Sequence, residues 1–141
     1  MDETTSLSRH IMPGELVYQD KYQRLCRVVA ELDGFSQEYY VSDWGQRAAM
    51  LVVRNDELLL VRQYQLIIGR LSSEVPEGKV DEGESPEAAA IRECLEEAGV
   101  QCFDATPLLS YHPSVDIWRN HTHIFSTGFT ESAWANPGRR A

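Results

Sequence analysis

Long hydrophobic runs and paired cysteines are missing from this chain of 141 residues. The longest apolar stretches, residues 48–53 and 58–61, are far shorter than the roughly 20 residues of a membrane-spanning helix. The three cysteines form no close-spaced pair, which argues against a disulfide framework and a cysteine zinc site. Residues 1–5 lack the basic-then-apolar order of a secretory signal, which favours a cytoplasmic location. With 43% hydrophobic and 25% charged residues, the composition is typical of one soluble domain.

Basic residues are also scarce, with 13 Lys and Arg against 22 Asp and Glu, for a net charge of −9. This balance argues against a nucleic-acid partner, since such proteins present basic surfaces. The window 74–97 alone holds nine acidic and two basic residues. Like charges on adjacent helical turns cost about 0.2–0.5 kcal/mol per pair. A folded protein that concentrates them keeps them solvated or neutralises them with cations.

The first part of the chain is expected to hold an arm and a hairpin. Residues 1–18 have weak periodicity and are predicted to form an N-terminal arm, followed by a single domain over residues 19–141. Strand-like residues on both sides of the turn signal Asp33-Gly34 predict a hairpin over residues 22–42. Further strands are predicted at 47–53, 58–64, 108–111 and 121–129, with 58–64 buried on both faces. Residues 65–73 and 74–83 are predicted to be loops.

A helix is predicted between Ser85 and Gly99. Ser85 suits the N-cap, Pro86 the first helical position and Gly99 the C-terminal stop. An apolar stripe is expected at helical spacing, formed by Ala88, Ile91, Leu95 and Ala98. Strands on both sides of one helix predict a mixed α/β layer fold.

The same helix carries Glu93, Glu96 and Glu97 at spacings of three and four, so they project from one side. The apolar stripe lies elsewhere, so these carboxylates are expected to face out of the core. Hard cations such as Mg²⁺ prefer carboxylate oxygens together with substrate phosphates. Arg92 is placed to pair with Glu96 or with Glu84 in the preceding loop. The alternative interpretation is a solvated acidic face.

The spacing of these residues resembles the signature of the Nudix hydrolases. Gly78 is followed after five residues by Glu84, and after seven more by Arg92-Glu93-Cys94-Leu95-Glu96-Glu97-Ala98-Gly99-Val100. Cys94 stands where a bulky aliphatic residue is commoner. The strings Val61-Arg62-Gln63-Tyr64 and Glu74-Val75-Pro76-Glu77-Gly78 are similar to those of the ADP-ribose and nucleotide-sugar pyrophosphatase branch. The box covers residues 78–100.

The resemblance implies an α/β/α sandwich around a mixed β-sheet, with an N-terminal hairpin extension and a short C-terminus. It also implies hydrolysis of a nucleoside diphosphate linked to another moiety, with Mg²⁺ or Mn²⁺ as cofactor. ADP-ribose or a related nucleotide sugar is the expected substrate, giving a nucleoside monophosphate and a sugar phosphate. Glu93, Glu96, Glu97 and the carbonyl of Glu77 are the implied metal ligands. Glu84 and Arg92 are the implied supporting pair of the catalytic set, and Gly78 is expected to permit a tight turn.

The resemblance also implies a set of substrate-binding residues, a general base and a second subunit. The residues expected to bind substrate are Arg62, Gln65 (an arginine in this branch), Arg47, Glu74 and Trp118. Asp116 and Glu131 are candidates for the general base, and Glu93 or Glu96 within the box would serve instead. A homodimer through the N-terminal hairpin is expected, with no membrane or nucleic-acid partner.

Three other interpretations stay open at this point. The same chemistry would act on nucleoside triphosphates or dinucleoside polyphosphates. A chain with a short C-terminus would alternatively be a catalytically impaired nucleotide-binding or interaction module. His121 and His123 would bind zinc on one strand face, although a packed or solvated strand face explains them more simply.

Overall fold

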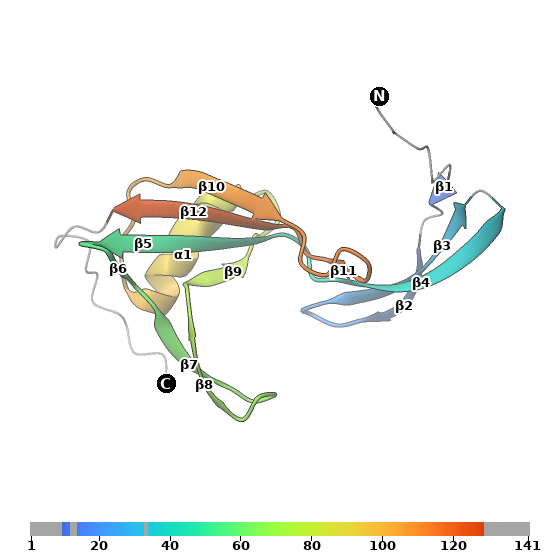
Figure 1. Ribbon diagram of the computed structural model, residues 1–141, viewed down its shortest axis with the longest axis horizontal. Coiled ribbons are helices and arrows are strands. Elements are labelled where there is room, and N and C mark those ends of the chain that lie inside the picture. Colours follow the sequence, from blue (N-terminus) through green and yellow to red (C-terminus); the bar gives the residue numbers. More distant parts are fainter. Residues whose placement is uncertain (1–9, 12–13, 33, 129–141) are drawn as a thin grey trace. The chain divides into compact units, whose positions relative to one another are not determined.

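The computed structural model describes residues 10–11, 14–32 and 34–128 (Figure 1). They fall into two compact units. The first unit combines the described residues up to Gly45 with His112–Asn120. The second combines Gln46–Tyr111 with the described residues from His121 onward.

The first unit is a twisted sheet built on a long hairpin. Strands β3 (Arg24–Leu32) and β4 (Phe35–Asp43) pair antiparallel, so the predicted hairpin is present. Three short strands join it: β1 (His10–Ile11), β2 (Glu15–Gln19) and β11 (Trp118–Arg119). The sequence assigns residues 15–18 to an arm, but β2 pairs antiparallel with β3. The free edge of β3 supplies the backbone partners that local periodicity does not reveal.

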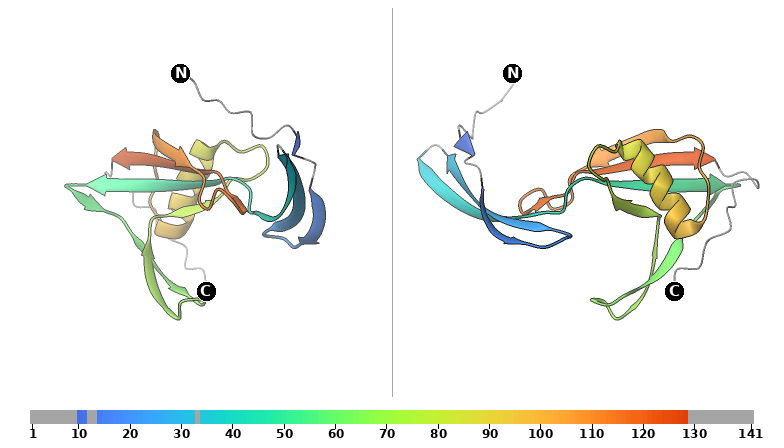
Figure 2. Two further views of the ribbon diagram at one scale, coloured as in Figure 1. Left: turned by 45° about the vertical axis from the view of Figure 1, so that its right-hand side comes forward. Right: turned by 180° about the vertical axis from the view of Figure 1, so that it is seen from behind.

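The second unit carries a mixed sheet with strand order β10-β12-β5-β6, and β9 pairs with β5. Its strands are β5 (Arg47–Arg54), β6 (Glu57–Leu58), β9 (Glu77–Lys79), β10 (Thr106–Tyr111) and β12 (Thr122–Gly128). Strands β12 and β5 run parallel, and the other pairs are antiparallel. Helix α1 (Pro86–Ala98) covers one face of this sheet (Figure 2). The predicted α/β class is therefore confirmed, with one helical layer present in the described part of the chain.

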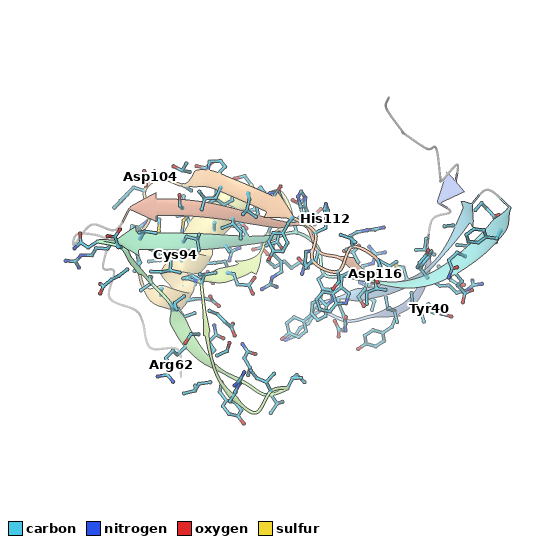
Figure 3. The ribbon with its side chains drawn as sticks, in the orientation of Figure 1. Tyr40, Arg62, Cys94, Asp104, His112 and Asp116 are labelled. Carbon is cyan, nitrogen blue, oxygen red and sulfur yellow. The ribbon has the colours of Figure 1, made fainter. Side chains whose placement is uncertain are left out.

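Helix α1 begins and ends where the sequence predicts. The Ser85 hydroxyl accepts a hydrogen bond from the Ala88 N–H at 3.1 Å, and Gly99 ends the helix with φ 68°. The predicted apolar stripe is wrong in part, because Ala88 is exposed and the buried positions are Ala89, Ala90 and Cys94 (Figure 3 labels Cys94). The small side chains of Ala89 and Ala90 let the helix approach the sheet closely. Among the described residues, no helix has the length and apolar character to cross a bilayer.

The chain between β5 and β9 differs from prediction. The expected buried strand over 58–64 splits into β6 and β7 (Val61–Gln65), and Leu58, Leu60 and Tyr64 are exposed. The expected loop over 65–73 instead contains the start of β8 (Arg70–Glu74), which pairs with β7 in a separate hairpin. Gly69, with φ 63°, lies at the turn between them. The polar residues of β7 explain its exposure, since an alternating strand needs only one covered face.

Arg92 fastens the loop before α1 to the helix. Its Nε and Nη2 donate to the two carboxylate oxygens of Glu84 at 2.9 and 2.8 Å, and Nη2 also donates to the Lys79 carbonyl at 2.9 Å. Glu84 further accepts the Asp81 N–H at 3.0 Å. The Arg92 hydrogen bonds, followed by the one from Asp81, lower the pKa of Glu84 to about 2. The predicted supporting pair is thus formed.

Glu84 is expected to make part of the stability sensitive to acid. Its pKa is lower in the folded than in the unfolded chain, so its contribution is complete above about pH 5 and is lost as the pH falls toward 2. Glu84→Gln should lower the free energy of unfolding at pH 7 by about 1–3 kcal/mol, typical of hydrogen bonds to charged groups. Urea unfolding at pH 7, 5 and 3 measures this. The gap between wild type and variant should shrink with falling pH, and a constant gap would contradict the assignment. Glu82→Gln, an exposed acid of the same loop, is the matched control.

Candidate functional site

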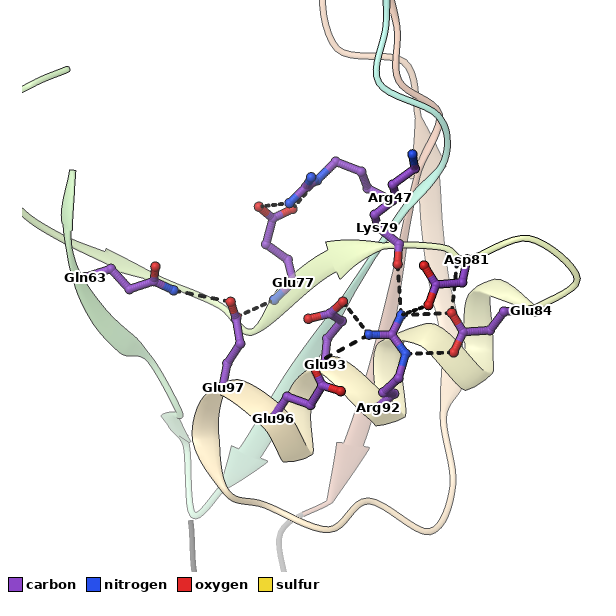
Figure 4. A network of polar contacts seen from close by, with 10 residues as sticks. All are labelled: Arg47, Gln63, Glu77, Lys79, Asp81, Glu84, Arg92, Glu93, Glu96 and Glu97. Atoms are coloured by element: carbon purple, nitrogen blue, oxygen red, sulfur yellow. Dashed lines mark hydrogen bonds and ion pairs between the residues drawn. The ribbon is translucent and has the colours of Figure 1, made fainter. Parts of the chain in front are cut away.

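The candidate site lies where the glutamates of α1 meet the backbone of β9 (Figure 4). The carboxylate of Glu97 accepts the Glu77 N–H at 3.0 Å. Its other oxygen accepts the side-chain amide of Gln63, on β7, at 3.3 Å. Glu97 therefore connects the helix to two separate strands.

The absence of a side chain at Gly78 leaves room for the Glu93 carboxylate. A methyl group on Gly78 would overlap the Glu93 carboxylate, so the lack of a side chain lets β9 lie directly against it. The expectation of a tight turn at Gly78 is wrong, because Gly78 is a buried residue within β9, opposite Ala48. Glycine is required here for close approach rather than for its backbone freedom.

The three glutamates differ in exposure. The side chain of Glu93 is only 14% exposed, whereas that of Glu96 is 39% exposed. The expectation that all three face out of the core is therefore wrong for Glu93. The buried face of α1 includes Ala89 and Ala90, and at 100° per residue position 93 lies between these two. Glu93 is consequently enclosed between the helix and β9.

The cluster carries more negative charge than its own cation can balance. Arg92 pairs with Glu93 at 2.6 Å as well as with Glu84, and lies 3.8 Å from Glu96. Burial raises the pKa of Glu97 above its ordinary value, and the neighbouring carboxylates of Glu93 and Glu77 raise it further. The raised pKa means that burial and the neighbouring negative charges disfavour the charged form of Glu97.

The donor set matches a hard divalent cation, which binds carboxylate and carbonyl oxygens. Within the described ranges, no three acid, histidine or cysteine side chains already converge closely enough to hold an ion. Glu93 is turned toward Arg92, and Glu97 toward Glu77 and Gln63. The chemistry of the donors fits the metal, and the side chains would need to reorient.

A cavity of about 770 Å³ opens beside the glutamates. Glu93, Glu96 and Glu97 line one side, and residues 59–63 line the other. Arg62, predicted to bind substrate, is among these residues, so it borders the same cavity as the three glutamates. Gln63 was not predicted as a site residue, and its position next to Arg62 in the resembling string is the signal that could have identified it.

The other predicted binding residues have protein partners. Arg47 donates two hydrogen bonds to Glu77, at 3.0 and 2.7 Å, and Gln65 donates to both oxygens of Glu74, at 3.0 and 3.2 Å. Both pairs belong to the second unit, on strands next to the cluster. Trp118 and Asp116 belong to the first unit. Glu131 lies outside the described residues.

His121, just before β12, contacts His123, on β12, with ring centroids 4.2 Å apart, and the His123 ring forms a hydrogen bond with the Gln46 side chain at 3.0 Å. No third metal-binding side chain joins them among the described residues. This pairing favours the packed strand face over the zinc interpretation.

Part of the chain is similar in sequence to known pyrophosphatases. An ADP-ribose pyrophosphatase of Bacillus subtilis is 29% identical over 90 residues, covering 64% of this chain and 49% of the relative. A mouse ADP-sugar pyrophosphatase is 35% identical over 66 residues, covering 45% of this chain and 30% of the relative. The matched stretches thus span about half or less of these relatives' lengths.

A solved structure of an ADP compounds hydrolase shares the fold. It superposes with a TM-score of 0.76 over 93% of this chain and 72% of that chain, at 21% identity. The profile of the NUDIX domain matches residues 44–138, which is more than half of the sequence. With the glutamate-bearing helix held against β9 by Gly78, this match shows that the chain belongs to the Nudix family.

Proposed function

We propose that this chain is a metal-dependent pyrophosphohydrolase that cleaves a nucleoside diphosphate linked to another moiety. ADP-ribose or a related nucleotide sugar is the proposed substrate, and a nucleoside monophosphate and a sugar phosphate are the products. The observation that carries the proposal is the crowded, partly buried glutamate cluster beside a cavity bordered by Arg62. The names of the two pyrophosphatase relatives support the substrate class.

In this proposal Glu93, Glu96, Glu97 and the carbonyl of Glu77 hold Mg²⁺ or Mn²⁺. The ion, when bound, would neutralise the diphosphate and lower the pKa of an attacking water. Arg92, bonded to Glu84, keeps the helix in register with the loop before it. Such supporting contacts orient the ligands.

Substrate recognition and proton transfer complete the proposal. Arg62 borders the cavity from β7 and would bind a phosphate oxygen. Arg47 would act indirectly, by holding the Glu77 side chain. Asp116 and Glu131 stay the proposed candidates for the general base.

We also propose that the chain forms a homodimer through the β3–β4 hairpin. Large apolar side chains of this sheet are exposed, among them Phe35, Tyr40 and, on β2, Tyr18. A second subunit would remove them from water.

Sedimentation equilibrium should give twice the 16.0 kDa mass of one chain, and a mass of 16.0 kDa at all concentrations would contradict the dimer. The cytoplasmic location stays a prediction.

Replacing Glu97 by Gln should lower turnover of ADP-ribose with Mg²⁺ about 10–100-fold, by analogy with the loss of groups that support a metal site. The substitution keeps the shape of the side chain but removes a ligand charge. Glu87→Gln makes the same charge change on an exposed residue in the first turn of α1 and is the control. Its turnover should match that of the wild type.

The assay should use ADP-ribose, a nucleoside triphosphate and a diadenosine polyphosphate in parallel, with chromatography of the products. AMP and ribose phosphate formed from ADP-ribose at the highest kcat/KM support the proposal. Faster cleavage of either other substrate would change the assigned substrate class. Nucleotide binding without turnover in the wild type would identify a binding module instead.

A further inference from the structure

Two thiols meet in the core of the second unit. Cys94 lies on α1 and Cys102 lies between α1 and β10, and their sulfur atoms are 3.5 Å apart. Cys94 is fully buried, and Cys102 is 5% exposed. We propose that this pair is a redox site, in which an oxidant of the peroxide class joins the two sulfurs in a disulfide that ties α1 to the chain leading into β10.

The C-terminal end of α1 brings the two cysteines together. Gly99 ends the helix in the left-handed conformation, and its N–H donates to the Leu95 carbonyl at 3.0 Å. The next N–H, of Val100, donates to the Cys94 carbonyl at 3.5 Å, and the Val100 side chain is buried in the same core cluster. The chain is thereby reversed, so Cys102 returns to Cys94 although eight positions separate them in the sequence.

The surroundings of the pair favour redox chemistry. In the part of the chain that the structure describes, no third metal-binding side chain lies close enough to complete a zinc site. Reacting atoms held about 3–3.5 Å apart are close to an attacking geometry, and bonding distance requires a further approach of about 1.5 Å. Because Cys102 lies outside the helices and strands, it can make this movement without breaking a strand ladder.

The oxidation would proceed in two balanced steps. The sulfur of Cys102, the more exposed of the two, takes one oxygen atom from hydrogen peroxide, which gives a sulfenic acid and one water. The Cys94 sulfur then attacks the sulfenic sulfur, forms the S–S bond and expels the oxygen as a second water. The two thiols lose two electrons and two protons, and the peroxide gains them. Burial raises the pKa of the Cys102 thiol, so its thiolate is scarce and the oxidation should be slow at neutral pH.

The test uses a Cys26→Ala parent, which keeps the two core thiols and removes the cysteine of the first unit. The parent is incubated for hours with excess hydrogen peroxide, and free thiols are then alkylated in denaturant. The mass of the single chain should fall by two hydrogen atoms, with no alkyl group added. A glutamate-specific protease cuts after Glu97, between the two cysteines, and the resulting peptides should stay joined until dithiothreitol is added.

Thermal unfolding measures the tie between α1 and the following chain. A disulfide across a short loop restricts the unfolded chain, so the oxidised parent should unfold about 5–10 °C higher than the reduced parent. Cys102→Ala in the same parent is the matched control and should gain nothing from peroxide. Free thiols after oxidation, a Cys102 that stops at sulfinic acid, a disulfide between two chains, or an equal gain in the control would each overturn the inference. None of these outcomes depends on metal binding or turnover.

Discussion

The close contact between β9 and α1 is the constraint on which the candidate site depends. Gly78 has no side chain, so β9 lies directly against the carboxylate of Glu93, and the Glu77 N–H reaches Glu97. Ala90 on the helix and Ala48 on β5 are fully buried small residues that allow the same close packing from within the core. Backbone rather than side chains therefore forms one wall of the cluster, which leaves the glutamate oxygens as its main chemistry.

This packing brings several carboxylates together, and the basic side chains nearby neutralise only part of their negative charge. Arg92 lies among several acids and binds Glu84 and Glu93 firmly, but one guanidinium cannot offset the whole cluster. Burial and neighbouring carboxylates raise the pKa of Glu97, so the residual repulsion is concentrated there. A divalent cation bound with a diphosphate would bring the missing positive charge together with the substrate. In the proposed function, the many acidic residues of window 74–97 and the reaction would both depend on this bound cation.

Local signals predicted the helix and the glutamate ladder, because Ser85 and Gly99 act within one turn of the backbone and spacing alone places side chains on a helix. The hairpin of β3 and β4 followed from its turn in the same way. Other features depend on tertiary packing: the enclosure of Glu93, the contact from Gln63, and the pairing of Arg47 with Glu77 join residues distant in sequence. The exposure of the β7–β8 hairpin does not follow from the sequence, because an apolar run does not reveal whether another element covers it.

The most direct test of this account is the binding of Mg²⁺ to a Gly78→Ala variant, measured by calorimetry in the presence of ADP-ribose. All glutamates remain in this variant, but the added methyl group must displace Glu93. Gly128→Ala places the same methyl group in open space at the end of β12 and serves as the reference. Gly78→Ala should bind Mg²⁺ about tenfold or more weakly, because disturbing the groups that support a metal site typically costs about 10–100-fold in metal affinity. Equal Mg²⁺ affinity in both variants, at unchanged folding, would contradict it.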